Sequence, residues 1–212
     1  FEASQWTTFQ SQDLRYVGTP AMNTPAKQLA SGLMLHTSQT IDALSHKDSQ
    51  WFLQSAEAGA IAQGFDALIL AIPGPQALAL AQHLDPDIKT IAGQSNMKGC
   101  WTLMARFEQR LEVPFEAAFV NQELISWVAR NSSKPQRTGQ ESWTIQANPL
   151  WSQECIELSK EDVQDQLLAC AKKLGLDCTG AEISMHRWRY ASGSTTATLG
   201  FYSNPALHLG MC

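Results

Sequence analysis

The sequence of 212 residues is poor in charge and has no basic excess. Charged residues make up 17% of the chain, and the formal net charge is -5. Nucleic acids and anionic membrane surfaces are bound by clustered positive charge, so neither is expected as a partner. No apolar run approaches the roughly 20 residues that a membrane-spanning helix needs.

Motifs for metal, nucleophilic or phosphate-loop chemistry are also lacking. The five cysteines are odd in number and form no C-x-x-C pair, which argues against a disulfide framework or a metal cluster. Reduced thiols in a cytoplasmic protein are the simpler interpretation. The histidines show no ligand spacing, and there is no G-x-S-x-G elbow or Walker loop. We therefore predict no metal site.

What the chain does have is enough apolar residues, 44%, for one domain or two small ones. It begins at Phe1, with no signal-peptide pattern, and ends on the apolar run 206–212. This run predicts a last strand with nothing behind it, and an unpaired strand is a liability. We therefore expect the natural chain to be longer.

The first half of the chain predicts a short helix, a β-meander and a buried strand. The run 65–73 is almost unbrokenly apolar and stops at Pro-Gly-Pro, as a strand buried on both faces would. A helix is expected over 75–83. The expected short strands of this half cover residues 33–36, 40–44, 51–55 and 60–63.

The second half predicts an antiparallel sheet with a helix. Ser159 is placed to cap a helix whose apolar positions recur at helical spacing, and Gly175 ends it. The expected strands cover residues 98–107, 117–121, 125–130, 142–147 and 181–190.

Four segments together resemble the renalase-like, FAD-dependent amine oxidases of bacteria. Their order and spacing fit that family across nearly the whole chain. The segments are R-Y-V-G-x-P-x-M at 15–22, F-D-A-L-I-L-A-I-P at 65–73, W-V-A-R-N-S-S-K-P at 127–135 and H-R-W-R-Y-A at 186–191.

The resemblance implies an α/β (α+β) fold in two interleaved parts. Residues 1–82 and 184–212 would belong to a partial FAD-binding domain, and residues 83–183 would form an inserted, mainly antiparallel substrate domain flanked by helices. The family's G-x-G-x-x-G turn, which holds a dinucleotide pyrophosphate, does not occur here. The Gly-Asp segment that follows the family's last strand is also absent, so flavin binding by this fragment alone is in doubt.

The resemblance also implies which residues contact FAD. Ile41 would pass beside the adenine ring, and Ala71, Ile72 and Pro73 end a strand where open α/β sheets bind ligands. The loop with Gly18 and Met22 would approach the flavin. Each has a simpler alternative. Ile41 would be an ordinary residue of the meander, residues 71–73 would be a strand end stopped by proline, and the loop with Gly18 would be a turn before a helix.

Six residues are implied on the substrate side. On a strand, Trp188 and Tyr190 share one face, while Arg187 and Arg189 share the other. The first face would offer an aromatic wall, and the second would offer guanidinium groups to a phosphate or carboxylate. The alternative is aromatic side chains in the core with arginines in solvent. The remaining two candidates, Trp127 and Lys134, border a polar loop.

The function implied is hydride transfer from a small substrate to FAD, with oxygen as the electron acceptor. Two substrate classes remain open, namely amines and misformed isomers of reduced nicotinamide dinucleotides. A different class of function is also open: the fragment is an inactive binding module that self-associates through open sheet edges, for example as a homodimer.

Overall fold

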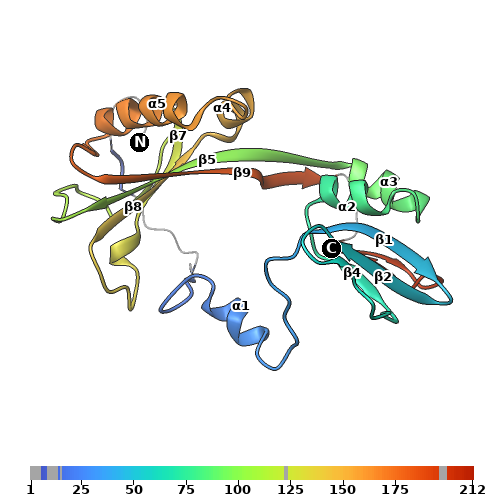
Figure 1. Ribbon diagram of the computed structural model, residues 1–212. Helices are drawn as coiled ribbons and strands as arrows, with labels where there is room; N and C mark the ends of the chain where they lie inside the picture. Colours follow the sequence, from blue (N-terminus) through green and yellow to red (C-terminus); the bar gives the residue numbers. More distant parts are fainter. Residues whose placement is uncertain (1–5, 9–13, 15, 122–123, 196–199) are drawn as a thin grey trace. The chain divides into compact units, whose positions relative to one another are not determined.

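The chain forms two compact units, each built from two separate stretches of sequence. The computed structural model describes residues 6–8, 14, 16–121, 124–195 and 200–212 (Figure 1). Unit 1 comprises residues 1–33 and 98–192, and unit 2 comprises residues 34–97 and 193–212. The predicted assignment of residues 1–82 and 184–212 to a FAD-binding domain, and of residues 83–183 to a substrate domain, stays a prediction. Arg15, in the first of the four segments, lies outside the described residues.

Unit 1 is organised around a five-stranded sheet. Its order is β6 (Ala117–Phe119), β7 (Ile125–Arg130), β8 (Glu141–Ala147), β5 (Ser95–Phe107) and β9 (Glu182–Thr195). The pairs β6–β7, β7–β8 and β8–β5 are antiparallel. Every second residue of β8 is buried, as expected of a strand with one face on a core.

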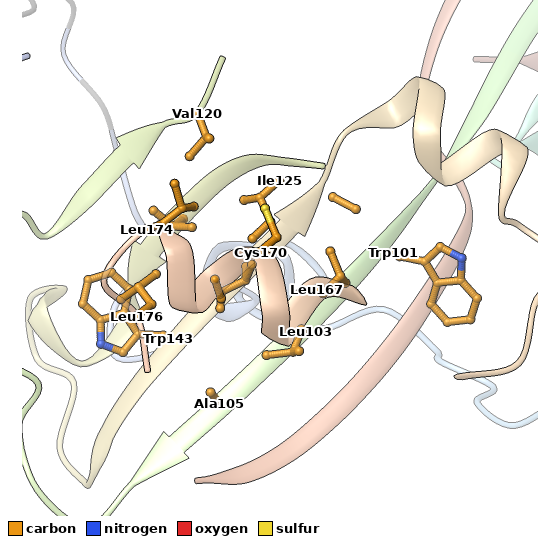
Figure 2. Packing of buried hydrophobic residues seen from close by; sticks show 14 of the residues in the cluster. Trp101, Leu103, Ala105, Val120, Ile125, Trp143, Leu167, Cys170, Leu174 and Leu176 are labelled. Carbon is orange, nitrogen blue, oxygen red and sulfur yellow. The ribbon is translucent and has the colours of Figure 1, made fainter. Parts of the chain in front are cut away.

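Helices α4 (Pro149–Glu154) and α5 (Lys160–Lys173) lie on one side of this sheet (Figure 1). Val163 and Leu167 of α5 are fully buried, and they belong to the same core as Trp101 and Leu103 of β5 (Figure 2). The cap predicted at Ser159 is confirmed, because its Oγ accepts a hydrogen bond of 3.1 Å from the backbone N–H of Asp162. Helix α1 (Thr24–Leu29) buries no residue.

Unit 2 contains two three-stranded sheets and two helices. The predicted meander is confirmed as β1 (Ile41–Lys47), β2 (Gln50–Ser55) and β3 (Gly59–Ala60), paired antiparallel. The other sheet has the order β10 (Tyr202–Asn204), β11 (Leu209–Met211) and β4 (Leu68–Leu70). Helices α2 (Gly74–Ala81) and α3 (Pro86–Gly93) share a core with it.

Three local predictions are wrong. The run 65–73 contains a strand only at Leu68–Leu70, and Ile69 is 71% exposed, because the helices contact one face of this short strand. Residues 34–37 form no regular structure, since they lack a pairing partner. The strand near the C-terminus is not open, because β11 pairs antiparallel with β10 on one side and parallel with β4 on the other.

Two helices were not predicted, although both carry a start signal. Asp85 caps α3 and Pro86 follows at its first position, while Asn148 and Pro149 open α4 in the same way. Both are short, at 8 and 6 residues, so their apolar periodicity is weak. The α+β fold class is nevertheless confirmed. Within the described residues, no helix is long and apolar enough to cross a membrane.

Candidate functional site

A pocket of about 510 Å³ opens in unit 2 where two parallel strands end. Strands β4 and β11 run parallel, with Leu70 opposite Met211, so Ala71 and Cys212 follow them at the same edge of the sheet. Ala71, Ile72 and Pro73 all line this pocket. The carboxyl ends of parallel strands are where open α/β sheets bind ligands. The structure therefore brings three of the predicted cofactor residues to one cavity.

The lining of the pocket is mainly apolar, with few polar groups. The larger apolar residues that line it are Ile72, Pro73, Ile91, Met97, Phe201 and Met211. The polar side chains that line it are the Ser95 hydroxyl, the Tyr202 phenol and the Cys212 thiol. Apolar walls with a few polar groups are typical of sites for cofactors and small molecules. A flat, largely apolar ring system fits this composition.

Gly74, at the start of α2, lies very close to Ser95 and to the backbone of Ala92. A Cβ atom at this position would lie 2.7 Å from the Cβ of Ser95 and 3.2 Å from the carbonyl oxygen of Ala92. The residue before it, Pro73, makes no side-chain hydrogen bond to the first turn of the helix. The missing side chain thus keeps this edge of the pocket narrow and made of backbone.

One wall of the pocket is held by a buried carboxylate. Asp85 is 2% exposed and accepts hydrogen bonds from the Tyr202 hydroxyl at 2.7 Å and from the Asn204 side-chain amide at 2.9 Å. Burial alone would raise the pKa of Asp85, but these bonds and backbone N–H groups outweigh it and lower the pKa. Burial, followed by the bond to Asp85, raises the pKa of Tyr202 to about 12. Tyr202 is therefore a neutral donor at physiological pH.

The alternating pattern of β9 separates aromatic from basic side chains, as predicted. Trp188 is 52% exposed and Tyr190 is 37% exposed, so the interpretation that these aromatics belong to the core is wrong. His186 and Trp188 contact each other edge to face, with ring centroids 4.3 Å apart. Trp127 on β7 pairs with Phe119 in a separate contact at 4.6 Å. Exposed aromatics at these positions are available for a ligand.

The two arginines of β9 already have a carboxylate partner. Arg189 donates two hydrogen bonds to Glu157, at 2.6 and 3.1 Å, and Arg187 lies 3.5 Å from the same carboxylate. The Arg187 guanidinium also lies over the Trp101 ring at 5.4 Å. The hydrogen bond from Arg189, and then its charge and that of Arg187, lower the pKa of Glu157. These contacts fasten β9 to the segment after α4.

Three of the remaining candidates, Gly18, Met22 and Lys134, lie on two loops of unit 1 that contact each other. Gly18 is buried, and its carbonyl oxygen accepts a 3.0 Å hydrogen bond from Arg137 Nη2. Met22 is 55% exposed, and Lys134 donates to the Asn131 side chain at 3.2 Å. Ile41 begins β1 in unit 2 and packs against that unit's core, outside the pocket lining.

Sequence reasoning missed most of the pocket. Gly74 carried a signal, because a glycine directly after a strand marks close approach or a turn. The others come from α3, the start of β5 and the β10–β11 hairpin, which no local pattern connects to residue 71. They are Ile91, Ala92, Ser95, Met97, Gly200, Phe201, Tyr202, Met211 and Cys212.

Three solved structures with a similar fold are described as oxidases. A proposed protoporphyrinogen oxidase from Exiguobacterium sp. 255-15 matches with a TM-score of 0.64 and 17% identity, over 84% of this chain and 41% of that one. Putrescine oxidase bound to putrescine matches with a TM-score of 0.56 and 16% identity, over 80% and 40%. Cyclohexylamine oxidase from Brevibacterium oxydans IH-35A matches with a TM-score of 0.54 and 13% identity, over 70% and 34%.

These similarities establish the fold, at identities of 17% or lower. The chain spans about two fifths of the length of the first of these oxidases, 41%. No protein-family model matches the chain. It therefore has the α+β fold of one portion of these enzymes, and its activity is a matter for proposal.

Proposed function

We propose that this chain is part of a flavin-dependent oxidoreductase and that the unit 2 pocket forms part of its FAD site. The observation that carries the proposal is the position of Ala71, Ile72 and Pro73. They were selected as cofactor residues from the sequence, and they line a cavity at the carboxyl ends of two parallel strands. The fold shared with several oxidases supports the same conclusion.

The residues of the pocket fit a flavin nucleotide. The side chains of Ile72, Met97 and Phe201 offer an apolar surface to a ring system. The absence of a side chain at Gly74 lets the start of α2 approach Ser95 closely, and a helix N-terminus favours anionic groups. Ile41 would approach the adenine from the meander, as the resemblance implies. FAD, when bound, supplies the capacity to accept a hydride.

The contribution of this chain would be to orient the reactants and to exclude water. Trp188 and Tyr190 would form the aromatic surface against which a substrate lies, with Trp127 farther along the sheet. Arg187 and Arg189 would fix β9 through Glu157. A cationic amine would be held by aromatic faces, whereas an anionic substrate would require a free cation. The proposal includes both substrate classes, namely amines and misformed isomers of reduced nicotinamide dinucleotides, and oxygen as the electron acceptor.

The proposal is tested by flavin retention in the longer protein that contains this chain. Purified without added cofactor, the protein is expected to show flavin absorption in the visible range. The Gly74→Ala variant is expected to weaken FAD binding about tenfold or more, because the new methyl group forces Ser95 and the helix apart. Equilibrium dialysis against FAD measures the change.

The matched control is Gly93→Ala at the end of α3, where a new Cβ meets nothing within 4 Å. It is expected to leave FAD affinity unchanged. Ala71→Phe is a second test, since Ala71 is exposed and tolerates a larger side chain, which would fill the pocket. A protein that stays colourless after addition of FAD would contradict the proposal, as would equal affinities in all three variants.

A further inference from the structure

Two cations of unit 1, Lys134 and Arg137, lie together at one turn, and neither forms an ion pair with a carboxylate of the described residues. Among the described arginines, Arg106, Arg110, Arg130, Arg187 and Arg189 each form an ion pair within 4.0 Å, and Arg137 forms none. Lys134 is likewise absent from every ion pair within the described part of the chain. Both side chains are half-buried. Two partly desolvated like charges are costly unless an anion offsets them.

The local sequence fixes the two cations side by side. The backbone N–H of Arg137 donates to the carbonyl oxygen of Lys134 at 3.2 Å, which closes a turn over Pro135 and Gln136. Proline at the second position and a positive φ at the third, 58° at Gln136, are features of a type II turn. The first and last residues of such a turn lie close together. The charge of Arg137 accordingly adds to burial in lowering the pKa of Lys134.

Neither side chain is free to swing away from the turn. Lys134 Nζ donates to Asn131 Oδ1 at 3.2 Å, and Arg137 Nη2 donates to the Gly18 carbonyl oxygen at 3.0 Å. Gly18 is itself fixed, because a Cβ there would lie 2.5 Å from the carbonyl oxygen of Ala21. Arg137 Nη1 is buried and has no hydrogen-bond acceptor within the described residues. The guanidinium thus retains unused donor capacity in a rigid setting.

We propose that Lys134 and Arg137 form a binding site for an oxyanion, either a phosphate or a carboxylate group of a small molecule. The lysine would supply a point charge, and the arginine would supply its charge and the guanidinium N–H groups that the bond to Gly18 leaves unused. The neutral Asn131 and the Gly18 carbonyl hold the cations without neutralising them. The site stands on these residues alone. That the anion belongs to the oxidised substrate rests on the proposed function.

Competitive acylation of lysines tests the site on the chain itself. Lys134 and the exposed Lys173 are labelled with acetic anhydride near neutral pH, at constant ionic strength, and quantified by mass spectrometry of peptides. Inorganic phosphate at ten times its dissociation constant is expected to slow labelling of Lys134 about tenfold and to leave Lys173 unchanged. A parallel arm with acetate distinguishes a carboxylate from a phosphate site.

Variants separate binding from folding. Arg137→Gln is expected to raise the phosphate dissociation constant about tenfold or more, as the loss of one charge-assisted contact would. Arg137→Lys keeps the charge and is expected to retain part of the affinity, while Lys173→Gln is the neutral control. Circular dichroism confirms folding. If Arg137→Gln unfolds, Lys134→Gln serves instead, because it leaves the bond from Arg137 to Gly18 in place; its phosphate affinity is measured by equilibrium dialysis, since it lacks the labelled lysine.

The proposal is overturned if neither phosphate nor acetate protects Lys134 more than Lys173. It is also overturned if Arg137→Gln binds phosphate as the parent chain does. This assay requires no flavin and concerns unit 1, whereas flavin retention concerns the pocket of unit 2. Failure of one proposal is therefore distinguishable from failure of the other.

Discussion

Replacing Asp85 by alanine is expected to destabilise unit 2 by about 3 kcal/mol. The change removes the N-cap of α3, worth about 1 kcal/mol. It also leaves the Tyr202 hydroxyl and the Asn204 amide without their acceptor, at about 1 kcal/mol or more each. Asn204 in turn accepts backbone bonds from Ala206 and Leu207, and the Leu207 carbonyl accepts from Trp51 Nε1. The loss is therefore expected to reach the core around Trp51.

Urea unfolding followed by ¹⁹F NMR of fluorotryptophan-labelled protein measures this effect, because Trp51 is the tryptophan that unit 2 contains. The control is Asp87→Ala, an exposed carboxylate in the first turn of the same helix, expected to cost about 0.5 kcal/mol. Asp85→Asn keeps the cap but sets its own amide against that of Asn204, so an intermediate loss is expected. Equal stabilities of the two alanine variants would contradict the assignment.

The same cluster predicts how the stability of unit 2 varies with pH. The pKa of Asp85 is lowered in the folded state, so its contribution is present above the unfolded value of about 3.9 and is lost as pH falls through the folded pKa. The pKa of Tyr202 is raised to about 12. Its contribution is present below the unfolded value of about 10 and is lost as pH rises through the folded pKa. Asp85→Ala is expected to remove the acid dependence and to weaken the alkaline one, because the burial that also raises the pKa of Tyr202 remains.

Replacing Glu141 by glutamine is expected to destabilise unit 1 by about 3 kcal/mol. The Glu141 side chain is 5% exposed, and it lies 3.5 Å from Arg130, whose side chain is 1% exposed. It also accepts hydrogen bonds from Trp143 Nε1 at 2.7 Å and from the Ser132 hydroxyl at 2.8 Å. Removing its charge leaves the buried guanidinium of Arg130 with one carboxylate partner among the described residues, the half-exposed Glu116 at 3.1 Å.

Thermal unfolding of Glu141→Gln and of the control Glu116→Gln tests this expectation. The control removes the other, more exposed partner of Arg130 and is expected to cost about 1 kcal/mol or less. Adding Arg130→Met to Glu141→Gln is expected to restore part of the stability, because no buried charge then lacks a partner. A double variant no more stable than Glu141→Gln alone would show that Arg130 is not the source of the loss.

The lowered pKa of Glu141 also predicts that unit 1 loses stability in acid. Burial alone would raise its pKa, but hydrogen bonds from Ser132, Trp143 and the backbone N–H of Leu111, together with the charge of Arg130, lower it. Its contribution is present above the unfolded value of about 4.3 and is lost as pH falls through the lower, folded pKa. The stability difference between the parent chain and Glu141→Gln is therefore expected to shrink in acid.

The sequence by itself determined the elements whose signals are local. Helix α5 has its cap at Ser159 and its glycine stop within one stretch, and β8 alternates buried and half-buried residues along its length. It also determined that the aromatic and basic side chains of β9 occupy opposite faces. These properties depend on neighbours a few residues away, and the structure confirms them.

Tertiary structure decided which of these residues form a site. The pocket joins residue 71 to the β10–β11 hairpin, and the bond that holds its wall links residues 117 positions apart. No local pattern encodes such a distance. Glu157, 32 residues from Arg189, occupies the guanidinium groups predicted for a ligand, and Arg137 meets Gly18 across 119 residues. Whether a cation is paired or available depends on packing between segments far apart in the chain, and only the fold determines it.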